Sequence, residues 1–304
     1  LALMPADATL NGDRAAAAAQ LTNLRRGSID LSSIYGPDDA PSPGLRDPAA
    51  PARMIEGVGA GTPSADPRNH LSPALSRTHR ALLRLHNMAV EECDDPGVAA
   101  AGPDPLFAYA RAEVRMLVQW LTMNRALPAL CAKPALDAVA DGRAPLFTRM
   151  VARMGGGVPP VPLEALVGAL PLITLGAEER AAAPGDVAAL LQLGRRVALP
   201  SGQETVRAIN RALGTRIAPL TDAELCAGPA ASMMTGAMLE HTPLWLYLLR
   251  EAEERGQDGR LGPVGSHVAA QSVAGLIFSD PYAYWLRPGN TGGRWRPEDS
   301  VLRV

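Results

Sequence analysis

The residues best suited to acid–base chemistry are an arginine and a histidine two positions apart. Arg68 and His70 lie in the segment ADPRNHLSP, residues 65–73, whose prolines favour a loop before a helix. A guanidinium can hold an anion or polarise a carbonyl, and an imidazole can exchange a proton near neutral pH. The pair therefore predicts a candidate catalytic site at Arg68 and His70. An exposed loop histidine beside a structural arginine ion pair is the alternative interpretation.

Other residues that could do chemistry lack catalytic or metal-ligating spacing. The cysteines Cys93, Cys131 and Cys226 are far apart without a CxxC pair, which favours reduced core thiols. The chain has no GxGxxG loop opening a helix and no GKS/GKT, HExxH or GxSxG motif. The remaining histidines are interpreted as structural at His79 and His86, and as surface or capping residues at His241 and His267.

Apolar residues recur at helical intervals over much of the chain, which predicts a mainly α fold with few or no strands. The clearest expected helix is Phe107–Cys131, and Ser72 with Pro73 favours a second helix start within Leu71–Glu92. Further helices are expected at Ala144–Met154, Leu163–Leu175, Asp186–Val197, Glu204–Leu213, His241–Arg255 and Pro263–Phe278. We expect one large domain, with residues 1–64 an irregular N-terminal segment packed on the core and residues 65–304 the helical domain.

Composition narrows the classes of partner. The 304 residues include 29 Lys+Arg and 31 Asp+Glu, a formal charge of -2, which gives no electrostatic reason to expect nucleic acid. No apolar run reaches the roughly 18 residues that cross a bilayer, so no membrane span is expected. No secretion signal is visible, although the sequence begins with Leu, and a cytoplasmic location is favoured.

Several phrases occur together in an order that resembles one known family. Asp66 and Arg68 follow a Gly/Ala-Asp-x-Arg pattern, and His79, His86 and Asn87 follow the helix pattern Leu-x-x-x-His with a later His-Asn. Further matching phrases are IDLSSIYG (29–36), LPSGQ (199–203), PLTDAEL (219–225), HTPLWLYLLREAE (241–253) and RLGPVGSHVAAQSVAGLIFSDPYAYWLRP (260–288). Together these phrases resemble the animal-type haem peroxidase superfamily, its bacterial members above all, and imply its helical fold.

The resemblance also implies a haem site that this sequence does not preserve. The family's proximal phrase resembles PLEALVGALPLIT (162–174), where Thr174 stands at the iron-ligating histidine and Pro171 at a neighbouring arginine. In LLQLGRR (190–196), Leu190 stands at the asparagine that orients the ligand, and Leu71 replaces the glutamate that esterifies haem in mammalian relatives. We therefore predict no bound haem and no other cofactor or metal.

These losses favour a haem-free pseudo-peroxidase whose former haem pocket takes an apolar small molecule, with cofactor-independent acid–base chemistry at Arg68 and His70 as an additional activity. One alternative is a genuine haem enzyme with an unrecognised axial ligand, for which Cys131, Met150 and Met154 are the candidates. Another is a structural or regulatory subunit with a collapsed pocket. The partner hypotheses are an apolar ligand, a second copy of the chain, or a peroxidase-like protein.

Overall fold

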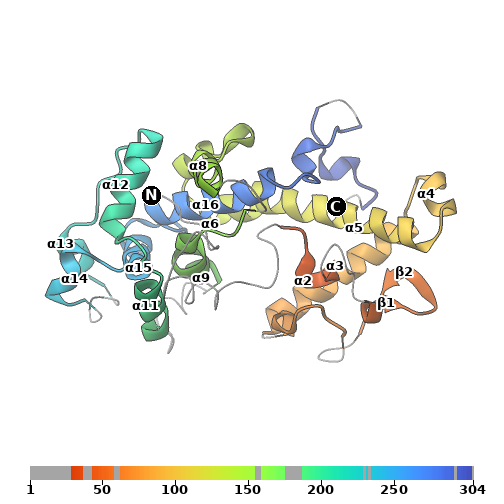
Figure 1. Cartoon of the computed structure of the whole chain (residues 1–304), viewed down its shortest axis with the longest axis horizontal. Coiled ribbons are helices and arrows are strands. Elements are labelled where there is room, and N and C mark those ends of the chain that lie inside the picture. Colours follow the sequence, from red (N-terminus) through yellow and green to blue (C-terminus); the bar gives the residue numbers. More distant parts are fainter. Residues whose placement is uncertain are drawn as a thin grey trace. The chain divides into compact units, whose positions relative to one another are not determined.

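The computed structural model describes residues 29–36, 43–57, 62–70, 72–154, 159–174, 187–228, 231, 234–290 and 293–302. Over these residues the chain is mainly α-helical, which confirms the predicted fold class. The described strands form one two-stranded sheet. Figure 1 shows the elements in sequence colours. The described residues of Met123–Ser279 form one compact unit, unit 1, and those of Ser28–Thr122 and Asp280–Val304 form another, unit 2.

The boundary between the two units differs from the division expected at residues 64 and 65. Ser64 and Ala65 both lie in unit 2. Residues 1–28, 37–42 and 58–61 lie outside the described residues. The packing of residues 1–64 as a whole and the organisation as one domain therefore stay predictions.

Unit 2 is built on two helices, α3 (Pro73–Glu91) and α5 (Pro103–Leu121), and a small antiparallel hairpin. The Ser72 side chain accepts a hydrogen bond from the Leu75 N–H and so begins α3 as the sequence predicts. Strand β2 (Ala50–Met54) pairs with β1 (Arg46–Asp47) and packs on both helices. The short elements of this unit are α2 (Ser32–Tyr35), η1 (Pro43–Leu45), η3 (Pro67–His70), α4 (Pro96–Ala100), η8 (Tyr284–Leu286) and η9 (Pro297–Asp299).

Unit 1 surrounds the helix α16 (Pro263–Phe278), which is buried on almost every side. A helix that is apolar all round belongs in a core rather than on a surface. The helices α7 (Lys133–Asp137), α8 (Pro145–Met154), η6 (Glu164–Ala169), α12 (Gly202–Leu213) and α15 (Leu244–Arg255) pack against it. The remaining elements of this part of the chain are η4 (Thr122–Ala126), α6 (Leu127–Leu130), η5 (Ala140–Gly142), α9 (Leu170–Thr174), α11 (Val187–Arg196), α13 (Asp222–Leu225) and α14 (Gly236–Glu240). Among the described helices, none is long and apolar enough to cross a bilayer.

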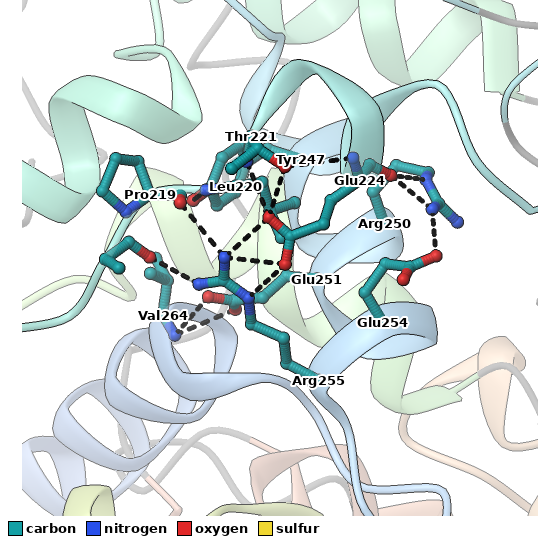
Figure 2. A network of polar contacts seen from close by, with 11 residues as sticks. Pro219, Leu220, Thr221, Glu224, Tyr247, Arg250, Glu251, Glu254, Arg255 and Val264 are labelled. Carbon is teal, nitrogen blue, oxygen red and sulfur yellow. Dashed lines mark hydrogen bonds and ion pairs between the residues drawn. The ribbon is translucent and has the colours of Figure 1, made fainter.

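Helix α15 is tied to the loop and short helix that precede it in the chain (Figure 2). Arg255 Nη2 lies 2.9 Å from Glu224 Oε1, and Arg250 Nη2 donates to the Glu224 carbonyl at 2.5 Å. The hydroxyl of Tyr247 accepts a hydrogen bond of 2.9 Å from the Leu220 N–H. These contacts hold α15 against the preceding loop and short helix. The first turn of α15 contributes Leu244 and Trp245 to the cavity described below.

Most expected helices are confirmed, with differences at their ends. Helices α3, α8, α12 and α16 end within two residues of the expected bounds. The expected helix at Phe107–Cys131 is instead α5 followed by the wider π-helical turn η4 and by α6. The expected helix at Leu163–Leu175 is likewise the π-helix η6 followed by α9. A regular apolar period does not reveal such a turn, because one wide turn shifts the period by only one residue.

Candidate functional site

A cavity of about 330 Å³ lies within unit 1, in contact with segments far apart in the sequence. Its wall comes from η6, α11, the start of α12, α14 and the start of α15. The apolar part consists of Val167, Leu190, Leu191, Leu199, Ala237, Met238, Pro243, Leu244 and Trp245. The polar residues of the lining are Arg195, Ser201, Glu204, Thr235 and His241. A mainly apolar concavity with a few polar groups is the usual form of a small-molecule site.

The shape of this wall depends on a glycine. A Cβ atom added at Gly194 would lie 3.6 Å from Leu199 Cδ1 and 3.9 Å from Val167 Cγ1, both of which line the cavity. These are ordinary contact distances, so alanine fits there, whereas a larger side chain must extend into the space between the helices. Gly194 therefore keeps part of the cavity open.

One lining residue, Trp245, has a buried polar atom without a partner among the described residues. This side chain is 2% exposed, and its indole Nε1 has no hydrogen-bond partner among the described residues. Leu244 and Val167, which line the same cavity, are also buried. A buried donor without an acceptor costs about 1–3 kcal/mol. Nε1 has almost no accessible surface, so this donor does not face the open space of the cavity.

The polar part of the lining carries opposite charges. Glu204 Oε2 accepts hydrogen bonds from the Ser201 N–H at 2.8 Å and from the Ser201 hydroxyl at 3.0 Å, forming the cap of α12. The backbone hydrogen bond from Ser201, its side-chain hydrogen bond and the charges of His241 and Arg207 lower the pKa of Glu204. Arg195 and His241 are exposed, as the sequence predicts for His241. The polar residues thus present an ionised carboxylate beside an exposed guanidinium and an exposed imidazole.

The residues that the family resemblance placed at the haem lie partly in this cavity. Leu190, at the position of the orienting asparagine, is part of the lining. Thr174 ends α9, and its side chain lies outside what the structure describes, as does Leu71. Pro171 is half-buried in the same helix. An aliphatic side chain at Leu190 cannot orient an iron ligand through a hydrogen bond, so the lining does not fit the family's haem site.

The alternative axial ligands pack as core residues. Met150 is buried in the core of unit 1, and Met154 packs against it. Burial raises the pKa of the Cys131 thiol to about 12, so the thiolate that binds iron is disfavoured. Over the described part of the chain, no group of three or more His, Cys, Asp and Glu side chains is placed to hold a metal ion.

Arg68 and His70 lie on η3 of unit 2, and neither lines the cavity. Arg68 Nη2 lies 2.6 Å from Asp66 Oδ2, and Arg68 Nε lies 3.0 Å from Asp66 Oδ1. The half-buried His70 places Nε2 3.2 Å from the Thr62 carbonyl, with its ring 5.5 Å from that of His79. Asp66 thus neutralises the arginine, as the structural alternative expects. The catalytic role of the pair stays a prediction, and loss of turnover in His70→Ala is its measurement.

The other histidines differ in their surroundings. His86 Nε2 lies 2.9 Å from the Ala52 carbonyl and His79 Nε2 lies 3.2 Å from the Pro63 carbonyl, contacts that agree with structural roles. Burial is the largest cause of a lowered pKa at both rings, to about 4 at His86. His267 is buried in α16, so its expected surface position is wrong. Its helix is buried on almost every side, polar residues such as Ser266 and Gln271 included, so a polar residue type there does not indicate a surface position.

Sequence reasoning did not identify Trp245, Gly194 or His241 as site residues. The one available signal was the phrase HTPLW, which supplies His241, Leu244 and Trp245 together. In comparisons with known proteins, no protein-family model matches the chain and no curated protein is similar to it.

Proposed function

We propose that this chain is a haem-free member of the animal-type peroxidase superfamily that binds an apolar small molecule in the cavity of unit 1. The observation that carries the proposal is the cavity of about 330 Å³, whose wall includes the aliphatic side chains of Val167, Leu190 and Leu199. Leu190 supports the link to the family, because it stands at the register position of a haem-site asparagine and lines this cavity.

The physical basis is the apolar wall. Each buried CH₂ group contributes about 0.8 kcal/mol, and only part of that sum remains after the entropic cost of association. For a ligand of eight to ten carbon atoms the sum is roughly 6–8 kcal/mol, and a remainder of about 4 kcal/mol corresponds to a Kd on the order of 1 mM. The volume of about 330 Å³ speaks against the alternative of a collapsed pocket.

The haem-enzyme alternative keeps one point in its favour. His241 lines the cavity, and an imidazole can ligate haem iron. We expect haemin titration to give no stoichiometric Soret band, because the orienting position is aliphatic. Thr174→His alone should recover no peroxidase activity for the same reason. An intense 1:1 Soret band that His241→Ala removes would establish the haem alternative instead.

Binding of the neutral fluorescent probe N-phenyl-1-naphthylamine tests the proposed function. The wild-type protein should bind one equivalent, and Gly194→Leu, which fills the cavity, should weaken binding at least tenfold. Gly194→Ala is the matched control and should bind as the wild type does, because its Cβ makes only ordinary contacts. Equal binding by the leucine variant, with unchanged circular dichroism, would place the probe elsewhere and refute the proposal.

A further inference from the structure

We infer that the outer face of α3 is an interface at which two copies of this chain pair, with their α3 helices antiparallel. The inference concerns unit 2 and does not depend on the ligand cavity of unit 1. It begins from a groove of about 620 Å³ along this helix, which is lined by Arg77, Arg80, Ala81, Arg84, Leu85 and Met88.

The groove combines exposed apolar surface with arginines that lack strong acidic partners. Met88 is 43% exposed, which is unusual for a large apolar side chain on a helix whose opposite face is buried. Over the described part of the chain, Arg77 and Arg80 form no ion pair, and Arg84 has one long contact, 3.4 Å from its Nε to Glu56 Oε2. Exposed apolar area edged by charged groups is typical of a protein interface.

Basic and acidic residues are separated along this part of the chain. Residues 67–90 contain arginines but no Asp or Glu, and residues 85–110 contain acidic residues but no Lys or Arg. The acidic residues begin at the end of α3 with Glu91, which contacts Arg53, and with the exposed Glu92. The outer face of α3 is therefore basic in its first half and acidic at its end.

The helix itself gains nothing from this order of charges. A helix dipole favours acidic residues in the first turn and basic residues in the last, and α3 has neither. Arg77 and Arg80 are three residues apart and Arg84 follows four residues later, spacings at which like charges repel. The pattern lowers the stability of α3 taken alone, which points to a contact outside the helix.

An antiparallel pair of α3 helices accounts for the pattern. A two-fold axis near Leu85 places the arginines of each copy beside the acidic end of the other copy's helix, and it brings the apolar parts of the two grooves together. One helix pair is small beside the roughly 1,200–2,000 Å² of a standard interface. The dimer is therefore expected to be weak, and weaker at high salt because its charges are exposed.

Complementary charge reversals in the full chain test this inference. Arg77→Glu/Arg80→Glu makes the face acidic at both ends, and Glu91→Lys/Glu92→Lys makes it basic at both ends. In sedimentation equilibrium the wild-type protein should dimerise, and each variant alone should dimerise at least tenfold more weakly, because like charges then meet. An equimolar mixture of the two variants should form heterodimers about as tightly as the wild type, since every opposed pair is again of opposite sign.

Two further measurements control for misfolded variants and for net charge. Arg149→Glu/Arg153→Glu reverses two exposed arginines of α8 and should dimerise as the wild type does. Raising the salt concentration from about 0.05 M to about 0.5 M should weaken the wild-type dimer severalfold, a readout that needs no variant.

Three results would overturn the inference. The first is a wild-type protein that stays monomeric up to about 1 mM, including one that binds poly-L-glutamate or phosphatidylserine vesicles through this face instead. The second is a pair of α3 variants that dimerise like the α8 control. The third is a mixture of folded variants that does not recover dimerisation, which would exclude the antiparallel arrangement.

Discussion

At the scale of single residues, Glu251 is a buried carboxyl group held at the start of α16. Its oxygens accept hydrogen bonds from the Val264 N–H at 2.9 Å and the Gly265 N–H at 3.1 Å, and Figure 2 shows it beside Arg255. Burial raises the pKa of Glu251 to about 7, against these hydrogen bonds and the charge of Arg255, which lower it. The effect of burial on the pKa of Glu251 is therefore larger than the opposite effect of its hydrogen bonds to the start of α16.

The raised pKa predicts a dependence of stability on pH. The unfolded carboxyl group ionises near pH 4.5, whereas the folded one holds its proton to about pH 7. Its stabilising contribution is therefore fully present below pH 4.5 and is lost as the pH rises through about 7. The total change is roughly 3 kcal/mol at most.

Glu251→Gln should remove this part of the pH dependence. Urea unfolding between pH 4.5 and 7.5 should give a free-energy difference between wild type and variant that shifts in favour of the variant as the pH rises. Glu240→Gln, on the exposed side of α14, is the matched control. A difference that stays constant over this range would refute the assigned cause.

At the scale of elements, the start of α12 lies against the first turn of α15. A Cβ atom at Gly202 would overlap the ring of Tyr247, which is fully buried. Gly202→Ala should therefore destabilise the protein by about 2 kcal/mol, since the packed ring has little room to move. Gly236→Ala is the control, because a Cβ there meets nothing within 4 Å. Equal thermal unfolding of the two variants would contradict this packing.

Arg250 supplies a second test at this scale. Its side chain is fully buried, contacts Glu253 and donates to Glu254 Oε1 at 2.5 Å. Arg250→Met should cost about 2 kcal/mol, because two partly exposed carboxylates and the Glu224 carbonyl lose their donor. Arg153→Met, on the exposed face of α8, should change the free energy of unfolding by less than about 0.5 kcal/mol.

The elements themselves were largely predictable from the sequence. Ser72 with Pro73 fixes the start of α3, and the apolar spacing around Val114 and Leu117 marks α5. Strand β2 was missed because Pro51 and two alanines give it little strand propensity; its position depends on packing against α3 and α5. The π-helical turns of η4 and η6 were also missed, because tertiary contacts rather than local sequence decide where such turns form.

At the scale of the whole molecule, the site could not be predicted from the sequence. The cavity joins Val167 to Trp245, which are far apart in the chain, and its volume depends on how α11 and α15 pack. Arg68 and His70, chosen because they are close in sequence, belong to the other unit. Local patterns identify helices, whereas a cavity and an unsatisfied donor are properties of packed helices.

Ligand binding should protect part of the molecule from hydrogen exchange. With N-phenyl-1-naphthylamine at ten times its Kd, the site gains about 1.4 kcal/mol, which slows exchange up to tenfold where opening exposes the cavity. We expect protection in α11, the start of α12 and the first turn of α15, and none beyond error in α3. Slowing confined to α3 would show that the ligand binds outside the cavity.

The central claim is that an apolar molecule occupies the cavity beside Trp245. The most direct measurement is a crystal structure with 1-bromonaphthalene, in which anomalous scattering locates the bromine independently of the refined ligand. The account predicts one strong anomalous peak within the space bounded by Leu190, Leu199 and Trp245. Anomalous density elsewhere, or an empty cavity at a ligand concentration that saturates the protein in solution, would contradict it.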